Sequence, residues 1–331
     1  MSRVTLHNLV GRSPAFLATL RLVERIAATD APVIIEGETG TGKEVVARAI
    51  HYGGARTDRP FVPVNCGAIP ENLIENELFG HARGAYTDAR EAQQGLVALA
   101  NGGTLFLDEI EALSPKGQIT LLRFLQDMNY RPLGARHEES ADVRIIAATN
   151  VDLLDLVEHK QFRLDLYFRL QILSLRVPPL RERPGDPEVL SAHFVRRFSA
   201  RYRVPEKTLD RSAMPLLNGY SWPGNVRELE NLINREFLLC EGPRIGISAD
   251  RLGVGRGVKP AGSSVALTQA RFQQAKARAI ADFERAYITE LLTRTHGNIS
   301  LAARISGKER SRLGKLVKKY GLARDDFGNG D

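Results

Sequence analysis

A glycine-rich segment near the N-terminus has the residue types and spacing of a phosphate-binding loop. It follows a short apolar run at 33–35 and precedes a helical pattern of apolar residues at 45–50. A strand, a glycine turn and a helix start in that order present backbone N–H groups and partial positive charge to a phosphate. Lys43 would reach the β- and γ-phosphates, and Glu44 stands where Ser or Thr usually binds Mg²⁺. The predicted nucleotide-binding residues here are Gly37, Glu38, Thr39, Gly40, Thr41, Gly42, Lys43 and Glu44.

A second apolar run, at 103–107, ends in two carboxylates, Asp108 and Glu109. Such a run is typical of a buried parallel strand, which would deliver both side chains to its C-terminal end. Asp108 would hold Mg²⁺, directly or through water, and Glu109 would polarise the water that attacks a phosphate. Acidic pairs are common and usually solvated, but this pair follows a predicted phosphate loop. We therefore predict a nucleotide with β- and γ-phosphates and Mg²⁺ as cofactors.

Asn65 and Asn150 each follow a further apolar run. Open α/β sheets bind ligands beyond the carboxyl ends of their strands, so Asn150 would sense the γ-phosphate or orient water. Asn65, taken alone, would more often be an ordinary turn residue. Arg163 and Arg169 follow six residues apart. They either pair with acids or donate charge to the phosphate of a neighbouring subunit.

The elements that would position these residues form an α/β fold over residues 1–178, a parallel sheet flanked by helices. Two prolines, Pro178 and Pro179, end this pattern, and residues 179–250 have the pattern of helices. A glycine- and serine-rich stretch predicts a flexible linker over 251–270. An all-α region over 271–331 closes the chain.

One helix start within 179–250 stands out. Asn225, with Glu228 three residues later, has the spacing of a capping box. Arg227 lies in the predicted first turn, where the helix dipole disfavours a cation. A phosphate contact would explain it better than a structural role, so Arg227 joins the candidate nucleotide ligands.

The positive charge of the chain is concentrated near its C-terminus. Between 304 and 319 there are seven basic residues and one acid, so this block supplies +6 of the net +7. The pattern there predicts a helix at 299–305, a turn and a second helix at 308–320. That is the arrangement of a helix-turn-helix, although a solvated basic helix face is the alternative. The candidate DNA-binding residues are Lys308, Glu309, Arg310, Arg312, Lys315 and Lys318.

The composition of the chain limits which kinds of protein it can be. With 331 residues, 43% of them hydrophobic, the chain can fold into two or three domains. It contains no run near the roughly 20 apolar residues of a membrane span and no N-terminal signal sequence. Cys66 and Cys240 fit no metal or redox spacing. We expect a cytoplasmic protein with no membrane partner.

Taken together, these motifs resemble those of the AAA+ bacterial enhancer-binding proteins, which activate sigma-54 RNA polymerase. The resemblance runs from about Leu9 to Leu322, and Glu44 is itself a feature of that family's phosphate loop. Asn65 matches the position that couples the γ-phosphate to Glu109. The segments that carry the likeness are 37–44, 77–81, 100–109, 162–169 and 222–229, with a Fis-type C-terminal unit.

The resemblance implies an AAA+ P-loop ATPase over 1–178, a helical lid over 179–250 and a Fis-type DNA-binding domain over 271–331. It also implies a self-assembling protein, from dimer to hexameric ring, that hydrolyses ATP at subunit interfaces and binds double-stranded enhancer DNA. Family members usually carry an N-terminal regulatory domain. The absence of one here predicts control by a separate regulatory protein or by expression level.

The sigma-54-contacting loop departs from the family pattern Gly-Ala-Phe-Thr-Gly-Ala. The predicted sigma-54 contacts are Gly84, Ala85, Tyr86, Thr87, Asp88 and Ala89. Tyr86 keeps an aromatic tip, whereas Asp88 adds a charge and removes backbone freedom. The alternative function is therefore a DNA-binding regulator or repressor whose ring no longer engages sigma-54. Another kind of AAA+ remodeller, such as a helicase loader, fits the segment 77–89 poorly.

Overall fold

The computed structural model describes residues 9–86 and 91–248, and near the C-terminus 284, 287–289, 291–293, 295, 297–306 and 310–320. The chain forms two compact units, Met1–Arg256 and Gly257–Asp331. Within the described residues, no helix is both long enough and apolar enough to cross a membrane.

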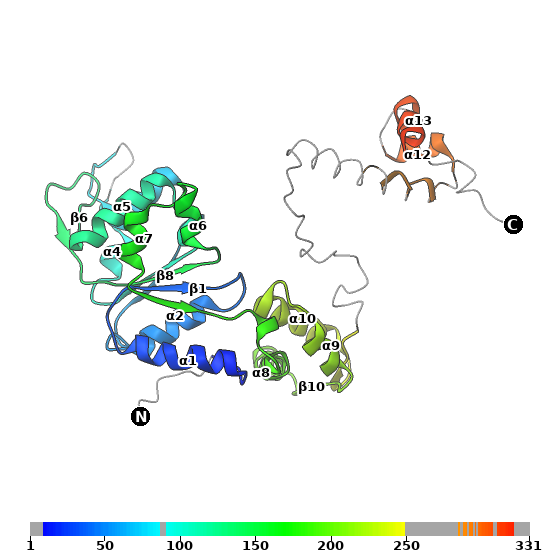
Figure 1. The fold of residues 1–331 in the computed structure, drawn as a ribbon, viewed down its shortest axis with the longest axis horizontal. Coiled ribbons are helices and arrows are strands. Elements are labelled where there is room, and N and C mark those ends of the chain that lie inside the picture. The colour runs from blue at the N-terminus through cyan, green and yellow to red at the C-terminus, as the bar shows by residue number, and fades with distance from the viewer. Residues whose placement is uncertain are drawn as a thin grey trace. The chain divides into compact units, whose positions relative to one another are not determined.

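A five-stranded parallel sheet forms the centre of the first unit (Figure 1). Its strands, in spatial order, are β2 (Phe61–Asn65), β5 (Thr104–Asp108), β8 (Arg144–Thr149), β1 (Val33–Glu36) and β9 (Leu173–Arg176). The predicted strands are confirmed, and β9 is an edge strand that the sequence did not reveal. Because neighbouring strands are parallel, their carboxyl ends share one edge of the sheet.

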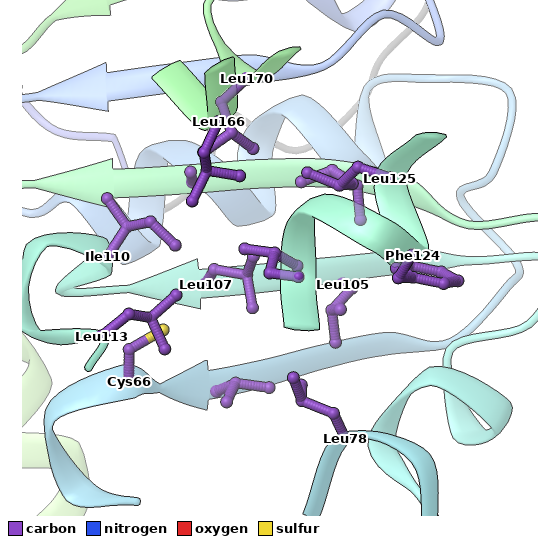
Figure 2. Packing of buried hydrophobic residues seen from close by; sticks show 14 of the residues in the cluster. Cys66, Leu78, Leu105, Leu107, Ile110, Leu113, Phe124, Leu125, Leu166 and Leu170 are labelled. Atoms are coloured by element: carbon purple, nitrogen blue, oxygen red, sulfur yellow. The ribbon is translucent and has the colours of Figure 1, made fainter. Parts of the chain in front are cut away.

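Helices cover both faces of this sheet (Figure 1). One face carries α1 (Pro14–Ala27) and α2 (Lys43–Tyr52), whose apolar residues share a core with Phe106 and Ile146 of the strands. The other face carries α3 (Ile74–Phe79), α4 (Leu96–Leu99), α5 (Pro115–Asp127), α6 (Leu153–Glu158) and α7 (Leu164–Leu170). Figure 2 shows Leu105 and Leu107 of β5 among side chains of that second core.

Short elements connect the sheet to its helices. They comprise two antiparallel ladders, β3 (Gly80–His81) with β4 (Gln93–Gln94) and β6 (Asn129–Tyr130) with β7 (Glu139–Ser140). The turns of 3₁₀-helix are η2 (Cys66–Ala68), η3 (Glu71–Leu73), η4 (Ile110–Ala112) and η5 (Leu180–Glu182).

A helical bundle (residues 180–247) follows β9. It contains α8 (Asp186–Tyr202), α9 (Ala213–Gly219) and α10 (Asn225–Leu239), with the short parallel pair β10 (Thr208–Leu209) and β11 (Arg244–Ile245). Its core is separate from the two cores of the sheet and contains Trp222, Phe198 and Phe237. The Trp222 indole N–H donates to Leu217 O at 2.8 Å, so the largest buried ring keeps its polar atom satisfied.

The second unit contains α12 (Ile299–Ile305) and α13 (Arg310–Lys319). Asn298 caps α12 by accepting from Leu301 N at 3.1 Å. Leu313 and Val317 of α13 are buried against Ile288, Leu292 and Ala302. The helix-turn-helix pattern and the predicted apolar face of its second helix are therefore confirmed for the described residues.

Candidate nucleotide-hydrolysis site

The segment 37–44 forms a closed loop around its own lysine. Gly40 and Gly42 have φ values of 79° and 97°, a region that residues with a Cβ rarely adopt. Gly42 precedes α2, and Lys43, 9% exposed, donates from Nζ to Gly37 O at 2.7 Å and Glu38 O at 3.3 Å. These carbonyl contacts hold the ammonium group where a phosphate oxygen would replace them.

The two predicted carboxylates lie beside this lysine. Burial lowers the pKa of Lys43, and the charges of Asp108, Glu111 and Glu109 oppose that shift. Burial raises the pKa of Asp108, whereas the ammonium group of Lys43 lowers it. The sheet therefore brings the phosphate loop and the end of β5 together as predicted, with Glu111 as an additional acid.

Asn65 and Glu109 flank the same glycine. A Cβ built on Gly67 would lie 2.9 Å from Glu109 Oε2 and 3.3 Å from Asn65 Oδ1. Asn65 is the register partner of Asp108, and its Oδ1 also accepts from Ala68 N at 3.1 Å. Asn65 is thus both a turn cap, as one interpretation of the sequence has it, and a neighbour of the carboxylate proposed to activate water.

Residues of the helical bundle form hydrogen bonds with the phosphate loop. Arg181 donates to both carboxylate oxygens of Glu38, at 2.7 and 2.5 Å, and these bonds lower the pKa of Glu38. Asn225 Nδ2 donates to Glu38 Oε2 at 3.1 Å and to Thr39 O at 3.0 Å. Neither Arg181 nor Asn225 was among the predicted site residues.

The capping-box prediction at Asn225 is wrong. Gly224 is the N-cap of α10, and Asn225 has a φ of 52°. Asn225 instead accepts from Leu180 N at 2.8 Å while its amide group binds the loop. The Glu228 carboxylate accepts from Gly224 N at 2.8 Å, one residue earlier than the capping-box pattern places it.

Arg227 and Asn150 each form a backbone hydrogen bond in this region. Arg227 N donates to Gly40 O at 3.2 Å, and the positive charge of Arg227 contributes to the lowered pKa of Lys43. Asn150 follows β8, and its N–H donates to Glu111 Oε1 at 3.3 Å. Arg227 therefore contacts the phosphate loop itself, and Asn150 contacts Glu111, a carboxylate that the sequence did not single out.

Three predicted residues have their side-chain contacts outside this cluster. Glu44 is exposed and pairs with Arg48 at 2.7 Å on the surface of α2. Arg163 pairs with Asp165 at 2.6 Å. Arg169 donates from Nε to Leu125 O at 2.8 Å and from a terminal nitrogen to Gln126 O at 2.9 Å.

A cavity of about 670 Å³ opens between α2 and the helical bundle. This size suits a small-molecule ligand. Its lining comes from segments far apart in the chain, so no local pattern could have revealed it. The lining residues are Leu9, Val10, Val45, Arg48, Ala49, Tyr52, Leu190, His193, Phe194, Arg197, Val226 and Glu230.

The predicted sigma-54-contacting loop follows β3. Tyr86 is 47% exposed, and its ring lies 5.0 Å from the His81 imidazole. Two backbone bonds, Ala82 N to Leu133 O and Leu133 N to Gly80 O, both 2.9 Å, tie the base of this loop to the β6–β7 segment. The structure does not describe Thr87, Asp88 and Ala89.

Of the candidate DNA-binding residues, Arg310 is exposed at the start of α13. Lys308 and Glu309 lie outside the described residues. The other three, Arg312, Lys315 and Lys318, lie within α13, and only their backbone is described.

Comparison with known proteins identifies the family. Models described as "Sigma-54 interaction domain", "AAA+ ATPase lid domain" and "Bacterial regulatory protein, Fis family" match residues 9–176, 181–251 and 279–320. The chain is 41% identical over 319 residues to the transcriptional regulatory protein GlrR of Escherichia coli, covering 96% of this chain and 69% of that protein. It is 41% identical over 316 residues to the response regulator protein PilR of Pseudomonas aeruginosa, covering 96% and 70%.

Solved structures with a similar fold and sequence are consistent with this family. NtrX from Brucella abortus in complex with ATP has a TM-score of 0.71 at 33% identity, covering 95% of this chain and 69% of that one. Its complex with ADP has a TM-score of 0.70 at 32% identity, with the same coverage. Nothing in these comparisons favours the alternative of a regulator that no longer engages sigma-54. The chain belongs to the family of sigma-54-dependent transcriptional activators, with an AAA+ ATPase core and a Fis-type DNA-binding domain.

Proposed function

We propose that this ATPase works as an oligomeric ring, from dimer to hexamer, that hydrolyses Mg²⁺–ATP at subunit interfaces and drives the loop 84–89 against sigma-54 RNA polymerase. The supporting observation is the convergence of Lys43, Asp108 and Glu109 at one sheet edge, beside a loop held by the helical bundle. The proposed domain limits are 1–178, 179–250, 251–270 and 271–331. We further propose a cytoplasmic location and control by a separate protein or by expression level.

The site residues fit a magnesium ion held mainly by phosphates and water. Asp108 supplies a carboxylate at the strand end, and a buried Glu111 oxygen lacks a hydrogen-bond partner. Among the described residues, no group of three His, Cys, Asp or Glu could hold an ion alone. Mg²⁺ typically takes one or two carboxylates and retains several waters. When bound, it would neutralise charge on the β- and γ-phosphates.

Each remaining residue has a proposed role. Lys43, Arg227 and the loop amides bind the phosphates, and the 670 Å³ cavity receives the base. Asn65 orients Glu109, which polarises the attacking water, while Asn150 responds to the γ-phosphate. Arginine fingers come from the neighbouring subunit.

Glu109→Gln is the direct test. The amide keeps the size of the side chain but cannot accept a proton, so we expect ATP binding to persist and turnover to fall about 10²- to 10⁴-fold. Equilibrium binding of a fluorescent ATP analogue and steady-state phosphate release measure the two effects. Lys43→Ala is the contrasting variant, because it should weaken binding itself. Parental turnover in Glu109→Gln would remove Glu109 from this role.

We propose that the second unit binds enhancer DNA as a dimer, with the start of α13 in the major groove and Lys315 and Lys318 on phosphates. Arg310→Ala should reduce the preference for specific over random DNA by about 1–3 kcal/mol, the value of one bidentate contact to guanine. Competition binding at fixed salt measures it, with exposed Arg304→Ala on α12 as the control. Equal losses on both DNAs would make Arg310 a backbone contact.

A further inference from the structure

The carboxylate of Glu111 is placed at the nucleotide site by the strained residue before η4. Glu109 has a φ of 54°, a rare conformation for a residue with a side chain. The chain then turns through η4, where Ile110 is fully buried. The turn carries Glu111 back to the sheet edge, where its Oε1 accepts from Asn150 N at 3.3 Å. One oxygen of Glu111 thus links the turn after β5 to Asn150, the residue after β8.

The other oxygen of the same carboxylate is buried and has no hydrogen-bond partner within the described residues. Leaving such an acceptor unpaired is unfavourable, and more so when it is charged. This cost is removed if a ligand or its water donates to the oxygen. Glu111 also lies close enough for its charge to oppose the lowered pKa of Lys43. The unpaired oxygen thus belongs to a carboxylate within electrostatic range of the lysine of the phosphate loop.

The phosphate loop of this chain does not supply the side-chain hydroxyl that binds Mg²⁺ in many such loops. Glu44 replaces the hydroxyl residue that binds Mg²⁺ in many phosphate loops, and its carboxylate points to Arg48 instead. An ion held by phosphate and by Asp108 retains waters that need acceptors.

We propose that Glu111 is a positioning carboxylate of the ATPase, with Oε1 holding the tip of β8 and Oε2 accepting from a water bound to the magnesium of Mg²⁺–nucleotide. This inference rests on the proposed magnesium site. Glu111 does not touch the reacting atoms in this scheme; it acts by orienting the ion's water shell and Asn150.

The test compares Glu111→Gln with the parent chain in Mg²⁺ titrations of the binding of a fluorescent, non-hydrolysable ATP analogue. Glutamine keeps an acceptor for Asn150 N–H but places an amide or a neutral oxygen at the second position. Changes to such outer ligands typically cost 10- to 100-fold in metal affinity. We expect the Mg²⁺ midpoint to rise about 10-fold or more, with analogue affinity in EDTA unchanged. Glu71→Gln, an exposed glutamate in η3, is the matched control.

The outcomes separate this inference from the proposed function. An unchanged Mg²⁺ midpoint in Glu111→Gln, with normal Mg²⁺ dependence in the parent, would overturn the role of Glu111 and leave the ATPase site standing. An equal loss of affinity with and without Mg²⁺ would show a purely structural role and would also overturn it. Parental binding that Mg²⁺ does not affect would refute the magnesium site itself.

Discussion

Alanine at the arginine finger should lower ATP turnover about 10³- to 10⁵-fold, since a finger from a neighbouring subunit is worth that much where it stabilises the transferring phosphoryl group. The candidates are Arg163 and Arg169. Nucleotide binding by the variant subunit should persist, because its own phosphate loop, Asp108 and Arg227 are untouched.

The present contacts of the two arginines predict different side effects. Arg163 holds an exposed pair with Asp165, a type of contact worth about 0–1 kcal/mol, so Arg163→Ala should leave stability nearly unchanged. Arg169 donates to two carbonyls at the end of α5. Losing both bonds should cost about 1–3 kcal/mol in the free energy of unfolding. Urea denaturation distinguishes this structural effect from loss of catalysis.

Mixing variants tests action between subunits. Lys43→Ala subunits lack a working nucleotide site but retain their arginines, whereas the arginine variant retains its site. Adding the first to the second should restore turnover at mixed interfaces, and parental turnover per subunit should rise with protein concentration. Arg201→Ala, an exposed arginine on α8, is the control. Turnover by a demonstrated monomer, independent of concentration, would rule out fingers in trans.

The strand ends were predictable from the sequence because a local pattern carries them. An apolar run of four to six residues followed by a polar tip identified Asn65, Asp108 and the residue after β8. Parallel pairing then places those tips on one edge. The edge strand β9 was not predicted, because it is short and Leu175 is its only buried residue.

The hydrogen bonds between the helical bundle and the phosphate loop could not be predicted from a local pattern. Arg181 and Glu38 are 143 residues apart, and Asn225 and Glu38 are 187 apart, so no window of sequence contains either contact. At Asn225 a local rule gave the wrong result. Its side chain leaves the cap position because tertiary contacts to Thr39 and Leu180 satisfy it better. Glu111 was missed because its significance depends on an unpaired oxygen, which only packing creates.

A buried charge joins the start of α1 to the start of α8. Asp186 is 0% exposed, and its Oδ1 accepts from Arg12 N at 2.6 Å and from Ser13 N at 2.9 Å. Its Oδ2 accepts from Ser13 Oγ at 2.9 Å and from Arg183 Nε at 2.8 Å. Arg183 is itself 2% exposed and stacks 3.7 Å over the Phe16 ring.

Asp186→Ala should therefore reduce the free energy of unfolding of the first unit by about 3–5 kcal/mol, the cost of leaving one member of a buried pair unmatched. Arg183 would keep a buried charge whose remaining hydrogen bond, to Val10 O, cannot compensate it. Because Leu9 and Val10 line the 670 Å³ cavity, nucleotide affinity should fall as well. Urea unfolding and equilibrium nucleotide binding measure the two effects.

The neighbouring pair Arg12–Glu188 provides the matched control, because both side chains are exposed and about half accessible. Glu188→Ala should cost at most about 1 kcal/mol. Replacing Asp186 and Arg183 together by apolar residues should cost less than Asp186→Ala alone, since no unmatched charge remains. If the double variant were as unstable as the sum of the two single variants, the charge pairing would not be the source of the stability. The backbone amides of Arg12 and Ser13, which lose their acceptor in either case, would then be the dominant contribution.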